Sequence, residues 1–235
     1  RGLRVRHEER SVKLRESMAA AAPGSDGRMH PSRLLAALQD KLPEDAIVIA
    51  DGGDFLSFAR VGLNAATYLD PGSFGCLGIG VPFGIAAGLA KPDRQVVVAT
   101  GDGSFGFNAI EVDTAVRHHV PLLIVVANNG AWQIEVHDQT TRYGRVVGTR
   151  LQFSDYAAMA RAFGMHAERV ERAEELPAAI DRALVNRPAL LDVLVTADAV
   201  SGDATSGLAW VPDLQPLTTW EDAEHRWRQS DRKTN

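Results

Sequence analysis

The sequence predicts an α/β protein: a doubly wound parallel sheet covered by helices on both faces, followed by a C-terminal extension. Runs rich in Val, Ile and Leu alternate along the chain with segments whose apolar residues have helical spacing. Continuously apolar runs are typical of parallel strands buried on both faces, and the helices between them supply the cover. We expect strands within 46–53, 95–103, 121–129, 165–170 and 189–197. We expect helices within 30–43, 77–90, 105–118, 154–163 and 174–186.

Three parts are expected along the chain. Residues 1–29 should form a charged linker helix and a flexible segment, because positions 20–28 read AAAPGSDGR. Residues 30–198 should form the α/β domain. Residues 199–235 lie beyond the last expected strand and should act as a lid or an interface. They contain Trp210, Trp220 and Trp227, out of four tryptophans in the chain.

Composition excludes several classes of protein. The chain has 235 residues, of which 45% are hydrophobic, and this suits a globular protein with a full core. A net charge of −5 argues against a nucleic-acid-binding protein, and no apolar run reaches the ~18 residues of a membrane span. The single cysteine, Cys76, allows no internal disulfide and fits a reducing, cytoplasmic location. Because the first residue is Arg1, we expect a piece of something longer.

The ends of three expected strands carry glycines and polar residues, reading ADGGD, ATGDGS and ANNG. Ligands of open α/β sheets bind outside the carboxyl ends of the strands, so these residues should meet. Glycines beside Asp102 let the backbone approach an anion, and a helix N-terminus after them favours negative charge. An acid in that position is explained by a cation, and Mg²⁺ prefers oxygen ligands shared with phosphates. The predicted metal ligands are Asp102, Asn129 and the carbonyl of Ala131.

A structural interpretation of the same residues competes with this one. The tripeptide GDG is a common turn, and Asp and Asn often lie at strand ends as turn formers or helix caps. The combination is more specific, because one helix and one buried strand fit between Asp102 and Asn129. One crossover of that length would return the chain to an adjacent strand.

GDG followed by NN at this spacing resembles the diphosphate–metal motif of thiamine-diphosphate (ThDP) enzymes. The resemblance covers residues 30–198, which that family calls its PP domain. The segment GSFGCLGIGVPFGIAAGLA resembles the part before GDG, where a large apolar residue, here Leu77, wedges between the two cofactor rings. DGGDF resembles the loop over the cofactor's pyrimidine. The resemblance implies cofactor contacts from Gly52, Asp54, Gly75, Cys76, Leu77, Gly101, Asp102, Gly103, Ser104, Asn129, Ala131 and Trp132.

Three residues that follow the expected metal ligands are candidates for catalysis. In the family this stretch faces the thiazolium ring and the substrate, which implies such roles for Trp132, Gln133 and Glu135. The alternative is a surface helix. The pattern is most similar to the branch of acetolactate synthases and oxalyl-CoA decarboxylases, and most of all to 2-hydroxyacyl-CoA lyases. The expected reaction is reversible cleavage of a 2-hydroxyacyl-CoA to formyl-CoA and a carbonyl compound, with Glu135 as base.

The resemblance also implies a partner. In the family a glutamate of a separate Pyr domain, usually from another subunit, activates the cofactor, and this domain has no counterpart in the sequence. We therefore expect a Pyr-domain partner, an oligomer and an acyl-CoA substrate, with neither nucleic acid nor membrane. Acetolactate synthesis and 2-oxo-acid or oxalyl-CoA decarboxylation are alternative reactions. A non-catalytic diphosphate-binding subunit and another Mg²⁺–diphosphate enzyme on a doubly wound sheet are alternatives of other classes.

Overall fold

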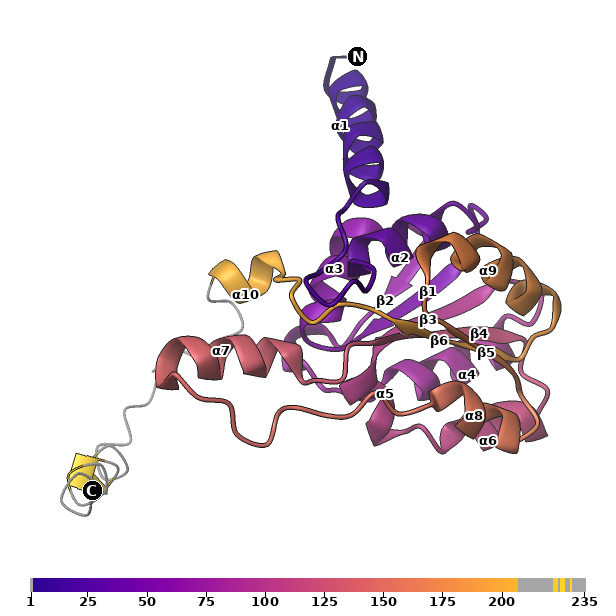
Figure 1. The fold of residues 1–235 in the computed structure, drawn as a ribbon. Coiled ribbons are helices and arrows are strands. Elements are labelled where there is room, and N and C mark those ends of the chain that lie inside the picture. The colour runs from indigo at the N-terminus through magenta and orange to yellow at the C-terminus, as the bar shows by residue number, and fades with distance from the viewer. Residues whose placement is uncertain (1, 207–221, 224, 227–228, 230–235) are drawn as a thin grey trace.

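A computed structural model describes residues 2–206, 222–223, 225–226 and 229 (Figure 1). In this part of the chain one sheet of six parallel strands forms the centre, in the order β2-β1-β3-β4-β6-β5. The strands are β1 (Ile47–Asp51), β2 (Thr67–Leu69), β3 (Val96–Gly101), β4 (Leu122–Asn128), β5 (His166–Val170) and β6 (Ala189–Leu194). The predicted α/β class is confirmed.

Helices cover both faces of the sheet, as Figure 1 shows. One face packs against α2 (Pro31–Gln39), α3 (Asp54–Gly62) and α9 (Leu176–Val185). The other packs against α4 (Gly80–Ala90), α5 (Asp102–Phe107), α6 (Glu111–Arg117) and α8 (Tyr156–Ala162). Short 3-10 helices lie at Gly72–Phe74 and Ala173–Glu175.

The central strands are buried along their length, apart from Gly101 at the end of β3. Alternate residues of β3 point to opposite faces, so that Val97 joins the core under α2, α3 and α9, while Val98 joins the core under α4 and α6. The same alternation holds in β1, where Val48 and Ile49 separate in this way. Burial on both faces is the physical reason for the continuous apolar runs in the sequence.

Helix α4 packs very close to the sheet because it presents glycines to it. A Cβ atom at Gly84 would lie 2.4 Å from Cγ2 of Val98, and one at Gly88 would lie 2.5 Å from Cγ1 of Val120. A larger residue at Gly84 would push α4 away from β3, and one at Gly88 would push it away from Val120, which precedes β4. The expected helix within 77–90 is therefore one that packs unusually close to its neighbours.

The structure differs from the sequence-based expectation in a few elements. The expected helix at 105–118 is divided into α5 and α6 around Asn108, whose Nδ2 donates to the carbonyl oxygen of Gly78 at 2.7 Å. Helix α3 and the edge strand β2 were not expected. Strand β2 has only three residues, too few to show a periodic pattern.

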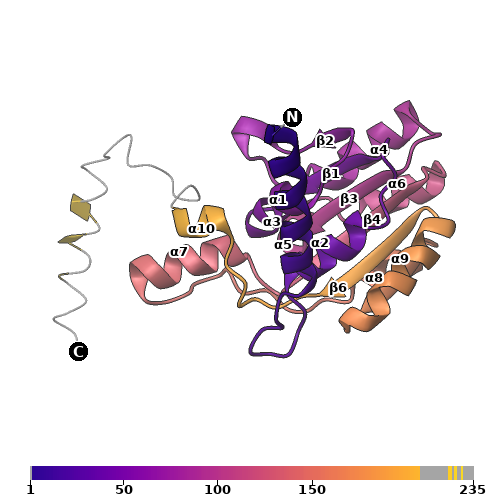
Figure 2. The ribbon, with the colours of Figure 1, turned by 90° about the horizontal axis from the view of Figure 1, so that it is seen from above.

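Some of the described helices lie outside the two helical layers that cover the sheet. Helix α1 (Gly2–Ala19) projects from the domain, and α7 (Gln133–Tyr143) and α10 (Gly202–Ser206) lie side by side at one edge (Figures 1 and 2). Residue Met29 pairs with Val195, which ties the segment after α1 to the end of β6. Among the described helices, none combines the length and apolar character that crossing a membrane requires. The tryptophans of the predicted lid lie outside the described residues.

Candidate active site

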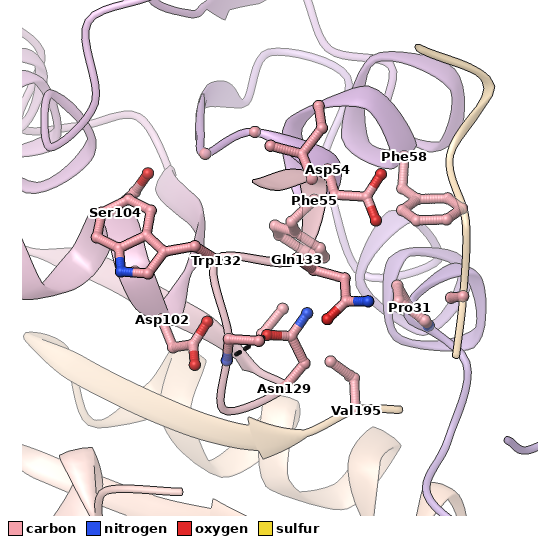
Figure 3. Close-up of a pocket in the computed structure, with 18 of the residues that line it drawn as sticks. Pro31, Asp54, Phe55, Phe58, Asp102, Ser104, Asn129, Trp132, Gln133 and Val195 are labelled. Atoms are coloured by element: carbon pink, nitrogen blue, oxygen red, sulfur yellow. Dashed lines mark hydrogen bonds between the residues drawn. The ribbon is translucent and has the colours of Figure 1, made fainter. Parts of the chain in front are cut away.

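A pocket opens at the carboxyl edge of the sheet, where the ends of β1, β3, β4 and β6 come together (Figure 3). The chain order reverses between β1 and β3, so this is the crevice where open α/β sheets bind ligands. Most of the residues expected at the site line it: Gly52, Asp54, Leu77, Gly101, Asp102, Gly103, Ser104, Asn129, Ala131, Trp132, Gln133 and Glu135.

Asp102 begins α5 directly after β3 and is only 2% exposed. Its Oδ2 accepts a hydrogen bond from the backbone N–H of Gly130 at 2.8 Å. Burial raises the pKa of this carboxyl group to about 7, although backbone N–H groups oppose the shift. A buried carboxylate of this kind is stabilised by a nearby cation.

Residues 129–132, which we call the metal loop, carry the other expected ligands. The Oδ1 atom of Asn129 accepts from the N–H of Ala131 at 3.1 Å, and Gly130 between them has a φ of +67°. This positive φ favours glycine. Because Gly130 also bonds to Asp102, the end of β3 and the metal loop form one polar unit across adjacent strands. The adjacency of these strands, expected from the spacing of the motif, is confirmed.

The oxygen donors at this place fit Mg²⁺. Asp102 offers a carboxylate, Asn129 a side-chain amide oxygen and Ala131 a backbone carbonyl, which are the hard ligands that Mg²⁺ prefers. In the described part of the chain, no group of three or more His, Cys, Asp or Glu side chains is arranged to hold a metal. A metal in this pocket would therefore depend on Asp102 together with uncharged oxygens and the phosphates of a ligand.

The indole ring of Trp132 packs against Gly103, the second glycine of GDG. A Cβ atom at Gly103 would lie 3.0 Å from the indole carbons of Trp132, so the ring needs a residue without a side chain there. Phe107 packs edge-on against the same indole, with ring centroids 5.4 Å apart. The aromatic wall of the pocket thus depends on Gly103.

Sequence reasoning missed Asp51, the last residue of β1. It is 1% exposed, and its carboxylate accepts from the N–H groups of Gly78 at 3.3 Å and Gly80 at 2.8 Å. Burial raises the pKa of Asp51, and these bonds oppose that rise. Asp51 therefore fixes the loop that carries Leu77. An acid directly before a Gly-Gly turn was the only signal for it.

Two expected cofactor contacts lie outside the pocket wall. Gly75 is exposed in a left-handed conformation, with a φ of 61°, and Cys76 beside it is also exposed. Leu77 is half-buried and lines the pocket. The roles expected for Gly75 and Cys76 stay predictions.

Asp54, which lines the pocket, lies beside His137 of α7, and both side chains contact the start of the C-terminal extension. The Oδ1 atom of Asp54 accepts from the N–H of Ser201 at 3.2 Å, and Nε2 of His137 lies 3.2 Å from the carbonyl oxygen of Ala199. The nearby carboxylate of Asp54 raises the pKa of His137, against the effect of burial. These contacts fix the beginning of the C-terminal extension against α3 and α7. Gln133 approaches the same imidazole at 3.3 Å.

A family model described as "Thiamine pyrophosphate enzyme, C-terminal TPP binding domain" matches residues 27–193. The chain belongs to this family. The match covers strands β1 to β5, the strand ends of β1, β3 and β4 that line the pocket, and β6 as far as Val193. It confirms the resemblance found in the sequence and assigns the domain to the binding of thiamine diphosphate.

Relatives that match this chain are named either acetolactate synthase or 2-hydroxyacyl-CoA lyase 2. A probable acetolactate synthase of Mycobacterium bovis is 42% identical over 186 residues, 77% of this chain and 34% of that protein. The 2-hydroxyacyl-CoA lyase 2 of Bos taurus is 35% identical over 63% of this chain and 24% of that protein. The human 2-hydroxyacyl-CoA lyase 2 is 32% identical over 72% and 27%. The chain therefore spans about a quarter to a third of the length of these relatives.

Proposed function

We propose that this chain supplies the diphosphate and Mg²⁺ half of the active site of a ThDP-dependent enzyme. The bond between Asp102 and Gly130 carries the proposal, because it joins the GDG turn to the metal loop at the family's cofactor pocket. Asp102, Asn129 and Ala131 would hold the metal, and Leu77 would support the folded cofactor. When bound, ThDP supplies a carbanion nucleophile and an electron sink. The residues of the protein would bind and orient the cofactor and exclude water from it.

The cofactor half can be tested by calorimetry on the complete enzyme, with ThDP titrated in the presence and absence of Mg²⁺. We expect Mg²⁺-dependent binding that Asp102→Ala removes. Asp113→Ala is the matched control, because Asp113 lies on the outer side of α6 and pairs only with Arg117 at 2.6 Å among the ion pairs described. Undiminished ThDP affinity in Asp102→Ala would refute the assignment of the site.

The reaction that we propose is reversible cleavage of a 2-hydroxyacyl-CoA. Glu135 lies in the first turn of α7 with its side chain exposed, and it belongs to the pocket lining. It would take the proton of the substrate's hydroxyl group while the bond between the hydroxyl-bearing carbon and the thioester carbon breaks. The first carbon leaves as an aldehyde or ketone. The thioester carbon keeps the bonding electrons and is protonated to give formyl-CoA. The similarity to 2-hydroxyacyl-CoA lyase 2 supports this reaction.

Acetolactate synthesis is the second candidate, and the higher identity to the mycobacterial synthase favours it. The complete enzyme should be assayed with a 2-hydroxyacyl-CoA, with oxalyl-CoA and with pyruvate, while formyl-CoA, CO₂ and acetolactate are measured. Formation of formyl-CoA from the 2-hydroxyacyl-CoA supports the lyase. Turnover of pyruvate to acetolactate without any cleavage of a 2-hydroxyacyl-CoA would place the protein among the synthases and leave Glu135 without its role.

A Pyr domain from the rest of the protein or from another chain would complete the site and supply the activating glutamate. We accordingly propose at least a dimer with the cofactor between domains, and an acyl-CoA substrate. The exposed thiol of Cys76 fits a reducing, cytoplasmic location. Size-exclusion chromatography with light scattering tests the assembly, and an active monomeric 235-residue chain would contradict it.

A further inference from the structure

The metal loop is supported from outside by a second segment, residues 149–154, which we call the brace. The backbone N–H of Trp132 donates to the carbonyl oxygen of Thr149 at 2.8 Å, and the N–H of Leu151 donates to that of Gly130 at 2.7 Å. Ala131 and Arg150 form an antiparallel bridge between them. Three consecutive residues of the metal loop are therefore paired with the brace.

The brace also meets the metal loop through a ring. The aromatic carbons of Phe153 lie 3.2 to 3.4 Å from the position that a Cβ atom on Gly130 would occupy. Gly130 lies between the two predicted ligands Asn129 and Ala131 and bonds to Asp102. A shift of Phe153 would therefore act directly on the residue that joins the ligands.

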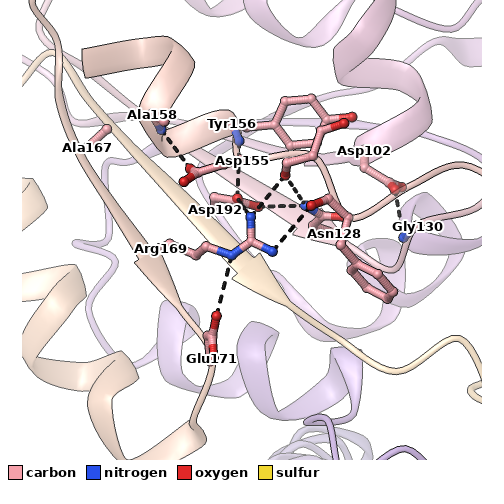
Figure 4. A network of polar contacts seen from close by, with 12 residues as sticks. Asp102, Asn128, Gly130, Asp155, Tyr156, Ala158, Ala167, Arg169, Glu171 and Asp192 are labelled. Atoms are coloured by element: carbon pink, nitrogen blue, oxygen red, sulfur yellow. Dashed lines mark hydrogen bonds and ion pairs between the residues drawn. The ribbon is translucent and has the colours of Figure 1, made fainter. Parts of the chain in front are cut away.

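A buried carboxylate on β6 lies between the metal loop and the residue pair that adjoins the brace, Arg169 and Tyr156 (Figure 4). Asp192 is fully buried and accepts from Asn128 Nδ2 at 2.9 Å, from the N–H of Tyr156 at 3.2 Å and from Arg169 Nη1 at 3.2 Å. Asn128 is the last residue of β4 and directly precedes the metal loop. Asp192 thus connects the start of the metal loop to the residues that follow the brace.

The guanidinium group of Arg169, on β5, completes the connection. Its Nη1 donates to the carbonyl oxygen of Ser154 at 3.1 Å, and its Nη2 donates to that of Phe153 at 3.4 Å. Asn128 Nδ2 donates to the same Ser154 carbonyl at 3.0 Å. A planar fork can reach two adjacent carbonyls and a carboxylate at once, which a lysine cannot. Strands β4, β5 and β6 are joined to the brace in this way.

We propose that Asp192 and Arg169 are positioning residues that hold the metal loop in its ligand-binding shape by fixing the brace. This inference rests on the proposed Mg²⁺ site. Removing either charge from a pair whose carboxylate is fully buried also destabilises the fold, so stability alone cannot distinguish positioning from packing. Mutation of residues that support metal ligands from outside typically lowers metal affinity by roughly 10–100-fold. Such a loss in a variant that is still folded distinguishes a positioning role from a packing role.

The test uses the complete enzyme and Mn²⁺ as a paramagnetic substitute for Mg²⁺. Mn²⁺ affinity is measured by electron paramagnetic resonance in Asp192→Asn, Arg169→Met and Arg169→Lys, at a temperature where circular dichroism shows each variant folded. We expect all three variants to bind Mn²⁺ at least roughly 10-fold more weakly than the wild-type enzyme does. Arg169→Lys should lose affinity with a smaller loss of melting temperature than Arg169→Met, because it keeps the charge beside Asp192. Arg182→Met is the control, since Arg182 pairs with Glu168 at 2.6 Å on the outer side of β5.

Hydrogen exchange of the metal-free protein gives a second readout. The amides of Trp132 and Leu151 should exchange faster in the Asp192 and Arg169 variants than in Arg182→Met, because these amides join the brace to the metal loop. If folded Asp192 and Arg169 variants show normal Mn²⁺ affinity and normal exchange, the positioning role is overturned and the proposed metal site still stands. A wild-type enzyme that binds no Mn²⁺ would instead overturn the proposed function, and the metal role of the loop with it.

Discussion

The carboxylate of Asp54 lies 3.6 Å from Nε2 of His137, joining the first turn of α3 to the middle of α7 beside the pocket. The same two side chains bond to Ser201 and Ala199. The root of the C-terminal extension is therefore held by a pair whose attraction depends on the charge of one imidazole.

We predict that this pair stabilises the protein mainly at low pH. The pKa of His137 is raised above its ordinary value near 6.5, so the stabilisation is full below that pH and is lost as pH rises through the raised pKa. His137→Gln should cost on the order of 1 kcal/mol at pH 6 and less at pH 9. Urea unfolding at both pH values measures the difference. A cost independent of pH would show that the charge on His137 contributes nothing.

Gly103→Ala should disturb the aromatic wall. The new methyl group would lie 3.0 Å from the indole of Trp132, so the ring must move or the turn must open. We expect a loss of about 1–3 kcal/mol in unfolding free energy, typical of overpacking, and weaker ThDP binding. Gly106→Ala is the control in the same helix, because a Cβ atom there meets nothing within 4 Å. Equal ThDP affinities in the two variants would contradict this account of the wall.

Asp51→Asn should loosen the loop that carries Leu77. The two carboxylate oxygens accept from Gly78 and Gly80, and an amide keeps only one acceptor. Leaving a buried N–H without a partner costs about 1–3 kcal/mol. The exchange rate of the Gly80 amide and the urea midpoint both report the change. The exposed Asp93→Asn should shift stability by less than about 0.5 kcal/mol.

Glu135→Gln separates catalysis from cofactor binding. If Glu135 takes the hydroxyl proton, kcat for cleavage of a 2-hydroxyacyl-CoA should fall by roughly 10²–10⁴-fold. The affinity for ThDP should not change, because the amide keeps the size of the side chain. An unchanged kcat in this variant would exclude Glu135 as the base.

Local pattern predicted every strand of the sheet except β2, and it placed Asp102 and Asn129 at strand ends. Strand β3 is apolar from Val96 to Ala99 and strand β4 from Leu122 to Ala127, because both faces are covered, and this leaves a clear signal in sequence. Asp102 and Asn129 were predictable because each directly follows the end of such a strand.

Contacts between distant segments left no local signal. Asp51 resembles any turn former until its bonds to Gly78 and Gly80 are seen. The brace depends on Asp192 and Arg169, which come from two other strands and look like ordinary strand residues in the sequence. The division between α5 and α6 at Asn108 arises from a bond to Gly78, which no helical pattern can show.

The glycines with which α4 faces the sheet have a consequence for the order of folding. Glycine in a helix interior costs about 1 kcal/mol relative to alanine, and an isolated helix of this length is marginal even with better residues. Helix α4 therefore has little structure of its own before β1 and β3 have paired. The loop carrying Leu77, which leads into α4, should therefore be among the last parts of the pocket to form. For the same reason, we expect substitutions within α4 to speed unfolding far more than they slow folding.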